Sequence, residues 1–363
     1  MKNIVWRSII AVWTALLLIA CDRQLGEEKA EAVSVPEQVS SPVLSRDQEM
    51  QLKKAVAEYW RDVRAAATQN RQNLSKLQEV VAEFLRDPTA ERLDESKVLW
   101  LENYRQYQAL NVVRNFPRAA PNVFADQGNI WLAIDPYPIA IGFIDEFGPY
   151  KNVGIVHDHT VEMSEVAIRA QHAITDESEA VLGFMPMAFL LWGDGKTSEQ
   201  RVVDFSVGSE AKPVQRRRKL LELNSLAISN DAAVLESWLG DTGPIDVLFY
   251  RLPVIAQLEL IKQATAATIE NNILLALNDV GQEDWRPHQV WPAVFSSQLT
   301  HLREQLKFLA ASGLNVGLLS QDLMAFVAKP EEQTGLQYEA LSAEQSAQFV
   351  DELHQILNAI RVK

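Results

Sequence analysis

Apolar residues recur at steps of three and four along most of the chain, which is the spacing of one face of an α-helix. The pattern predicts a long helix over residues 46–86. The break at Asp87-Pro88 then makes Thr89 the expected N-cap of a second helix. The alternation of apolar and polar positions that is typical of β-strands does not extend over a useful length. The sequence therefore predicts an all-α fold.

Helical periodicity returns in five later stretches, residues 159–192, 215–239, 254–277, 296–311 and 342–360. Between residues 116 and 150, prolines and glycines interrupt the pattern, which predicts a long irregular segment of a kind that often carries function. Residues 194–214 are polar and contain glycine and proline. We therefore expect two packed helical bundles, residues 46–205 and 206–363.

The N-terminus is typical of a secretory signal. Lys2 and Arg7 precede an apolar run over residues 9–20, which is shorter than the roughly 20 residues that a membrane-spanning helix needs. Residues 1–20 are thus predicted to be a signal peptide. The run ends in Leu-Ile-Ala-Cys, which resembles the bacterial lipobox, and this resemblance implies cleavage before Cys21 and a lipid on its thiol.

Residues 21–45 are rich in Glu, Ser, Val, Gln and Pro without periodicity, as expected of a flexible tether. Lipid on Cys21 would attach the protein to a membrane of the bacterial cell envelope, with the folded part facing the periplasm. Asp22 resembles the inner-membrane retention signal of enterobacterial lipoproteins, which favours the inner membrane and leaves the outer membrane open.

Composition and charge narrow the possible partners. The chain has 363 residues, 47% of them hydrophobic and 23% charged, so it can bury a large core and is not intrinsically disordered as a whole. Its net charge of −14 repels a phosphate backbone, so we expect no nucleic-acid partner. Cys21 is the single cysteine, which excludes an intramolecular disulfide and a zinc site built from several cysteines.

The run GFMPMAFLLWG, residues 183–193, resembles the signature of imelysin-like proteins. That signature reads Gly-x-His-x-x-Glu and is typically followed by Phe/Tyr-Leu-Leu-Trp-Gly. Gly183 keeps the first position, whereas Met185 stands in the place of the histidine and Ala188 in the place of the glutamate. The motif is therefore present with its two polar side chains replaced.

Three other segments are similar to the same family: Trp100 with Tyr107, the Ile-Asp-Pro-Tyr-Pro turn at residues 134–138, and the stretch from Arg216 to Trp238. The resemblance covers most of residues 95–240. It implies an all-helical, two-bundle, exported protein of a family linked to iron uptake, some of whose members are classed as metallopeptidases. It also implies that Asp135, Tyr137 and Trp192 line a cleft, if the cleft persists.

A histidine and a glutamate three residues apart lie on one helical face and can share a divalent metal, or the carboxylate can act as a base. Met185 and Ala188 can do neither for a hard or borderline ion, because a thioether is a soft ligand suited to copper(I) and a methyl group has no lone pair. We expect a packed apolar helix here, no resident cofactor and no catalytic residue. Binding of a divalent metal elsewhere stays open.

The alternative is a relocated metal site. His157, Asp158 and His159 could converge with Asp135 on a metal if they lie on an extended segment. Helix capping by Asp158 and solvated histidines are the competing interpretation. A metal-binding protein or metal-dependent peptidase would follow from such a site. The Gly-x-Ser-x-Gly, His-Glu-x-x-His and glycine-rich phosphate motifs do not occur where they would support another enzyme class.

The hypothesis that the sequence favours is a lipoprotein that acts as a non-catalytic binding or interaction module in iron acquisition. Its expected partners are the membrane, through the lipid on Cys21, and an unidentified envelope protein or small ligand. Loss of the polar pair argues against an enzyme and leaves the question to experiment.

Overall fold

The computed structural model describes residues 44–278, 291–314, 316–328 and 342–362. Within these ranges the regular structure is helical, apart from an isolated β-bridge between Phe147 and Tyr150, and the predicted all-α fold is confirmed. Of the helices described, none combines the length and apolar composition needed to span a bilayer. Cys21, the predicted signal peptide and most of the predicted tether lie outside the described residues.

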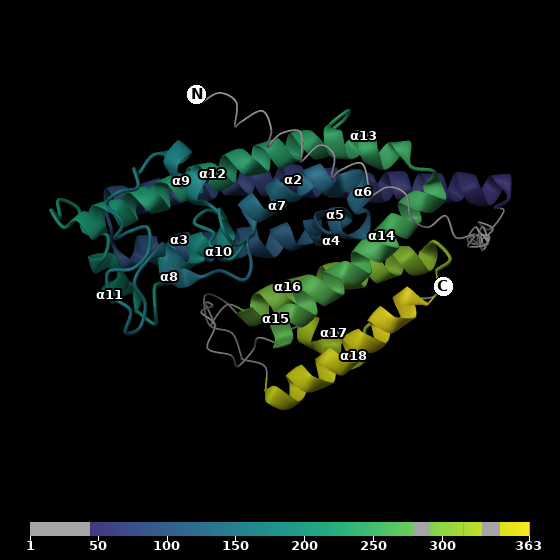
Figure 1. The fold of residues 1–363 in the computed structure, drawn as a ribbon. Coiled ribbons are helices and arrows are strands. Elements are labelled where there is room, and N and C mark those ends of the chain that lie inside the picture. Colours follow the sequence, from purple (N-terminus) through teal and green to yellow (C-terminus); the bar gives the residue numbers. More distant parts are fainter. Residues whose placement is uncertain (1–43, 279–290, 315, 329–341, 363) are drawn as a thin grey trace, which may run out of the picture. The chain divides into compact units, whose positions relative to one another are not determined.

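Three long helices pack together: α2 (Arg46–Arg86), α3 (Ala90–Tyr107) and α12 (Lys212–Leu239). Helix α2 lies against both of the others (Figure 1). The Thr89 hydroxyl accepts a hydrogen bond from the backbone N–H of Arg92 at 3.3 Å, which confirms the predicted N-cap. The apolar periodicity therefore predicted these helices and the break between the first two.

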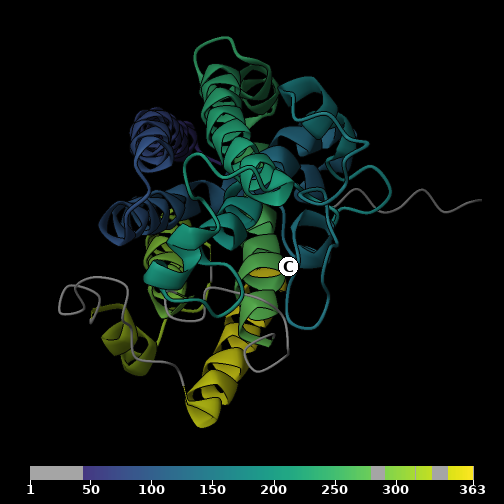
Figure 2. The ribbon, with the colours of Figure 1, turned by 90° about the vertical axis from the view of Figure 1, so that its left-hand side faces the viewer.

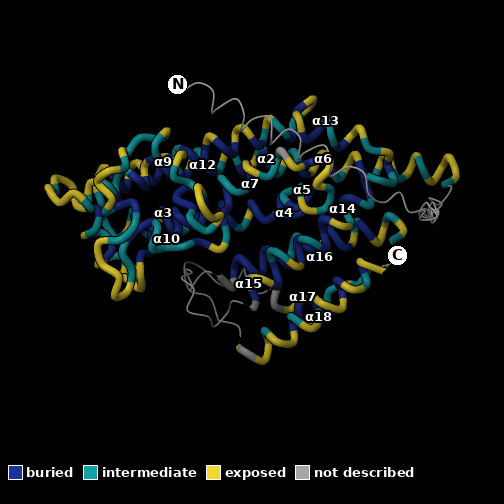
Figure 3. The backbone as a smooth tube through the Cα atoms, viewed as in Figure 1, coloured by how far each residue is buried: buried dark blue, intermediate teal, exposed yellow. Residues whose placement is uncertain are grey.

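Large apolar side chains fill the space between these helices. Trp60 lies flat on Phe249, with 4.2 Å between ring centroids, and its Nε1–H donates to Asp246 at 2.8 Å. Trp100 and Tyr104 of α3 stack at 5.0 Å, so the aromatic stripe of this helix belongs to the core. Figure 3 shows that the buried residues follow the inner sides of the helices and that exposed residues face outward.

The proline-rich segment after α3 is a series of short helices rather than an irregular stretch. They are η1 (Gln108–Leu110), α4 (Asn111–Arg114), α5 (Phe116–Ala119), α6 (Pro121–Phe124), η2 (Ala125–Gln127), α7 (Gly128–Ile134) and α8 (Ile141–Ile144). The prediction was wrong here because Pro117 and Pro121 lie in the first turns of their helices, where the missing N–H removes no helical bond. The backbone thus changes direction every few residues.

Residues 159–192, predicted to be helical, contain two short helices with an irregular stretch between them. These are α9 (Glu165–Gln171) and α10 (Phe184–Trp192). Helix α10 cannot extend backward, because Gly183 has φ of +105°, outside the helical region. The next helix, α11 (Ser198–Val203), begins with a capping box between Thr197 and Gln200.

The remaining helices are α13 (Pro244–Arg251), α14 (Val254–Thr268), the π-helix η3 (Ile269–Leu274), α15 (Leu275–Asn278), α16 (Trp291–Ala311), α17 (Gln321–Ala328) and α18 (Ala343–Arg361). Helix α18, yellow in Figure 2, packs against α14 and η3. The chain from Arg46 onward forms one compact unit, whose main core includes residues on both sides of position 205. The division into two bundles at that position stays a prediction.

Candidate functional site

The motif helix α10 is enclosed by the main core. All of its residues are buried, and Met185 and Ala188 are 2% and 0% exposed. Trp100 of α3 donates its Nε1–H to the carbonyl of Phe184 at 2.9 Å, which ties the first turn of α10 to α3. The helix therefore presents its motif positions to apolar neighbours rather than to solvent.

Gly183 locks the start of α10 against the turn that follows α7. A Cβ at this position would lie 2.6 Å from Cδ of Pro136 and within 2.9 Å of the carbonyl oxygens of Ile134 and Ala133. The Gly183 N–H donates to Oδ1 of Asn224 at 3.0 Å, which fixes the same point to α12. Because φ is +105°, a side chain here would be strained as well as crowded. The motif glycine thus has a geometric role.

The motif positions do not fit a hard or borderline divalent metal. The Met185 thioether is a weak, soft ligand and the Ala188 methyl group is none. Both side chains pack among the apolar residues of the main core. Across the described ranges, no group of three or more His, Cys, Asp or Glu side chains is arranged to hold a metal ion.

The residues of the alternative metal site lie in different surroundings. Asp158 is exposed, and its Oδ1 accepts from the backbone N–H and the hydroxyl of Thr160, at 2.9 and 2.6 Å. These hydrogen bonds lower the pKa of Asp158. His159 is exposed beside it, whereas His157 is largely buried, with Nε2 3.2 Å from Oδ1 of Asp145.

Asp145 is itself bound by a buried arginine. Arg217 donates through Nε and Nη2 to the two carboxylate oxygens of Asp145, and the Nη2 bond is 3.0 Å long. A two-pronged arginine contact of this type satisfies a buried carboxylate and fixes its orientation. His157 therefore lies against an ion pair that holds the loop to α12.

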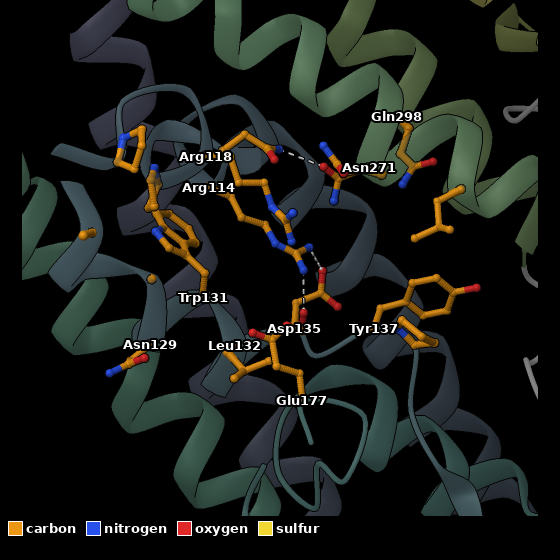
Figure 4. Close-up of a pocket in the computed structure, with 18 of the residues that line it drawn as sticks. Arg114, Arg118, Asn129, Trp131, Leu132, Asp135, Tyr137, Glu177, Asn271 and Gln298 are labelled. Atoms are coloured by element: carbon orange, nitrogen blue, oxygen red, sulfur yellow. Dashed lines mark hydrogen bonds and ion pairs between the residues drawn. The ribbon is translucent and has the colours of Figure 1, made fainter. Parts of the chain in front are cut away.

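A cavity of about 680 Å³ lies where α4 to α7, the turn after α7 and the π-helix η3 meet (Figure 4). This volume is in the range of small-molecule sites. Its polar and aromatic lining includes Tyr104, Arg114, Asn115, Trp131, Asp135, Tyr137, Asn271, Asn272 and Gln298. The short helices of the proline-rich segment supply half of this wall, so the irregular path of the backbone creates the cavity.

An arginine–aspartate pair lies at the base of the cavity. Arg114 Nη1 donates to Oδ2 of Asp135 and Arg114 Nη2 donates to the Asp135 carbonyl oxygen at 2.6 Å (Figure 4). Asp135 is 1% exposed, and its Oδ1 accepts no hydrogen bond from any described residue. Burial raises the pKa of Asp135, and Arg114 opposes that shift. The pair is nearly neutral as a unit and keeps one free acceptor.

A matching donor lies on α7. Trp131 is buried, lines the same cavity, and its Nε1–H finds no acceptor within the described part of the protein. An indole nitrogen can only donate. Tyr104 adds a hydroxyl 3.5 Å from Oδ2 of Asp135, and burial raises the pKa of this tyrosine well above its usual value. The cavity therefore offers a carboxylate acceptor, an indole donor and a neutral phenol.

The opposite wall comes from the π-helix. A π-turn is rare and occurs frequently at functional sites. Asn271 and Asn272 of η3 both line the cavity, and Asn272 Oδ1 accepts from Nδ2 of Asn115 at 2.8 Å. Asn115 Nδ2 also donates to the Thr268 hydroxyl at 3.1 Å. These amides connect the short helices to α14 and η3 across the cavity.

A family model described as imelysin (peptidase M75) matches residues 56–272 of the chain. The chain belongs to the imelysin family. The matched region runs from α2 to the π-helix and contains both the motif helix and most of the cavity wall. A search of curated proteins found no match.

Within this imelysin, the cavity brings together some of the residues that the sequence singled out. Asp135 and Tyr137 line it, whereas Trp192 lies at the end of α10 with its ring 5.3 Å from that of Trp100 and under the Lys97 ammonium. Sequence reasoning missed Arg114 completely. Arg114 lies just before the proline-rich segment and belongs to no sequence motif that would have identified it.

Proposed function

We propose that this imelysin is an envelope-anchored lipoprotein that binds a small ligand without catalysis and acts in iron acquisition. The observation that carries the proposal is the cavity, whose lining residues include two with a buried polar atom that no described residue pairs: Oδ1 of Asp135, an acceptor, and Nε1 of Trp131, a donor. A buried polar atom without a partner costs free energy, so a ligand that pairs with both is bound favourably.

The cavity chemistry favours a neutral polar ligand. Arg114 balances the Asp135 carboxylate, so the site has little net charge to attract an ion. The amides of Asn271 and Asn272 provide further donors and acceptors on the facing wall. The ligand class that fits is a small molecule with hydrogen-bond donors and acceptors on opposite sides of a flat body, which would lie beside Tyr137 and Trp131.

Two observations support a non-catalytic role. The motif positions carry side chains that cannot bind a hard metal, and these side chains are enclosed by the core. The residues of a relocated site lie apart: Asp135 is bound to Arg114 and Asp158 to Thr160, whereas His157 lies beside Asp145 with its Nε2 making no hydrogen bond to a described residue. Anchoring and iron acquisition rest on the lipobox-like Cys21 and on the family resemblance.

Elemental analysis and a peptide-cleavage assay on the detergent-purified, full-length protein test the non-catalytic role. We expect no stoichiometric metal and no cleavage above a blank. Stoichiometric metal that is lost in His157→Ala and retained in His354→Ala, which changes an exposed histidine on α18, would establish the metal-site alternative and overturn our proposal.

Growth under iron limitation tests the proposed roles of the lipid anchor and of the cavity in iron acquisition. A strain that lacks the gene should grow poorly in chelator-treated medium, and the intact chain should restore growth. Cys21→Ser should release the protein from membranes and reduce the restoration, as should Trp131→Phe, which removes the indole donor. Met185→Leu should restore growth fully. Equal growth with and without the gene would reject the role in iron acquisition.

A further inference from the structure

A second cavity, of about 490 Å³, lies between α2 and α16, and residues of η1 and α4 also line it. It is lined over about three turns of α2, from Ala55 to Ala66, and over four turns of α16, from Gln298 to Ala311. This elongated space is separate from the imelysin motif and from the Arg114–Asp135 pair. Its volume is also in the range of small-molecule sites.

Three buried amide side chains line this second cavity. Asn111, Gln298 and Gln305 line it and are all more than nine-tenths buried. Oδ1 of Asn111, Oε1 of Gln298 and Nε2 of Gln305 make no hydrogen bond to any residue in the described ranges. Asn111 and Gln298 thus each have an unpaired carbonyl oxygen, which is an acceptor, and Gln305 has an unpaired amide nitrogen, which is a donor.

Gln108 holds the amides of Asn111 and Gln298 in place and leaves their carbonyl oxygens without a partner in the described structure. Oε1 of Gln108 accepts from Nδ2 of Asn111 at 2.8 Å and from Nε2 of Gln298 at 3.1 Å, and Nε2 of Gln108 donates to the Tyr104 carbonyl at 2.8 Å. Asn111 and Gln298 each bind Gln108 through the amide nitrogen, so the carbonyl oxygen of each is the atom left without a partner. The network is pre-organised, which reduces the entropy that a ligand must lose on binding.

Part of the cavity wall is aromatic. Tyr59 of α2 and Phe308 of α16 stack with 4.9 Å between ring centroids and 25° between ring planes, which bridges the two helices. Burial raises the pKa of Tyr59, so its phenol is neutral. Flat apolar groups pack well against such rings.

The rim and lining select against anions. Glu58, Asp62 and Glu304 stand at the exposed edge, and no lysine or arginine is found among the described residues that line the cavity. His301 is the basic residue there, and burial lowers its pKa, so it is neutral at neutral pH. A carboxylate or phosphate would therefore meet repulsion and find no countercharge.

We propose that this cavity is a second ligand site, which takes a neutral molecule made of an amide joined to a flat apolar group. The ligand's amide pairs with Gln305, and its apolar group lies against Tyr59 and Phe308, which is one turn from Gln305 on α16. The site does not depend on the proposed function of the first cavity, although Gln298 lines both.

Benzamide and benzoate provide a matched pair of probes, since they share a ring and differ in the head group. We expect calorimetry or ligand-observed NMR on the full-length protein to detect benzamide binding in the millimolar range, with benzoate at least tenfold weaker. Equal binding of the two, or no binding of benzamide, would overturn the proposal.

Gln305→Met removes the unpartnered amide and keeps the side-chain length. We expect benzamide binding to weaken by about tenfold while the melting temperature stays the same or rises, because a buried unpaired group is lost. Gln51→Met, the same change at an exposed position of α2, is the control. A lower melting temperature with unchanged benzamide binding would assign Gln305 a structural role and reject the site.

The unaltered protein provides a test that does not depend on folding of a variant. A photoreactive benzoylbenzamide should label peptides of α2 or α16 when mass spectrometry maps the products, and excess benzamide should suppress that labelling. Labelling confined to α7 or to the turn after it would place benzamide in the first cavity and overturn the proposal.

Discussion

The motif helix α10 and the wall of the first cavity meet at Gly183, yet the side chains buried in the two regions differ in polarity. Along α10 the side chains are apolar and closely packed, and the positions of the family's polar pair, Met185 and Ala188, are enclosed by the core. Across the joint, Asp135 and Trp131 are buried as deeply but keep polar atoms that no described residue satisfies. Packing thus explains the first region completely and the second only in part.

The difference indicates where binding is to be sought in this imelysin. Replacing a histidine and a glutamate by methionine and alanine strengthens local packing and removes the side chains that could bind a metal or act as a base at that point. A buried carboxylate and a buried indole whose polar atoms lack partners destabilise the fold, and apolar packing does not offset that loss. Four experiments with substituted chains can break or sharpen this comparison.

Restoring the polar pair should have the largest effect. Met185→His with Ala188→Glu places an imidazole and a carboxylate in an apolar core, and Glu at a fully buried alanine is also too large. We expect at least about 5 kcal/mol of destabilisation, measured by urea unfolding. Added Zn²⁺ should not restore the melting temperature. Stoichiometric zinc with a recovered melting temperature would mean that α10 still borders a working metal site.

Gly183→Ala should come next. The new Cβ would meet two backbone oxygens and the Pro136 ring, and φ of +105° is unfavourable for alanine. We expect a loss of about 3 to 4 kcal/mol in the free energy of unfolding. Gly195→Ala is the matched control, because φ there is +65° and no described atom lies within 4 Å of the new Cβ, so only about 1 kcal/mol is lost. Equal losses would show that crowding at Gly183 has no effect.

Arg114→Met should cost about 3 kcal/mol at pH 7, because it leaves the Asp135 carboxylate buried without its cation. Since Arg114 lowers the pKa of Asp135 against the effect of burial, its removal raises that pKa further above the unfolded value. A raised carboxyl pKa favours the protonated folded state, so stability is lost as pH rises through the folded pKa. Chemical unfolding between pH 4 and pH 8 should show a deficit that grows with pH.

A double variant checks the cause of that deficit. Arg114→Met combined with Asp135→Leu removes both charges, and we expect it to be more stable at pH 7 than Arg114→Met alone, with little dependence on pH. A double variant as unstable and as sensitive to pH as the single one would contradict the assignment of the effect to Asp135.

Met185→Leu should have the smallest effect. The two side chains have similar volumes, so we expect a change within about 1 kcal/mol in the free energy of unfolding. Metal content and growth under iron limitation should not change. A loss of bound copper(I) in this variant would show that the thioether is a ligand and would remove the contrast between the two regions.

The sequence predicted the long helices well because each of them buries one continuous apolar face, and such a face repeats at 3.6 residues whatever lies opposite. Thr89 and the break before it were predicted for another local reason, the proline at position 88 and the preference of threonine for the N-cap. The short helices around Pro117 and Pro121 were missed, since a proline that ends one helix is also suited to the first turn of the next.

The candidate site was only partly predictable. Asp135 and Tyr137 were identified through a family-like turn, and both line the cavity. Arg114, Asn271 and Gln298 come from distant parts of the sequence, and only tertiary packing brings them to one cavity. That Asp135 Oδ1 and Trp131 Nε1 lack partners in the described structure is a property of three-dimensional neighbours, which no spacing in the sequence encodes.

The π-helix η3 has one consequence for how this surface can arise or disappear. A π-turn accommodates one residue more than an α-turn by widening, so the helix beyond it keeps nearly the same orientation around its axis. Deleting a single codon within Ile269–Leu274 would let an ordinary helix run straight through, with Leu275 and its successors facing nearly as before and the widened turn that carries Asn271 and Asn272 lost. The π-helical part of the cavity wall thus differs from an ordinary α-helix by one inserted residue.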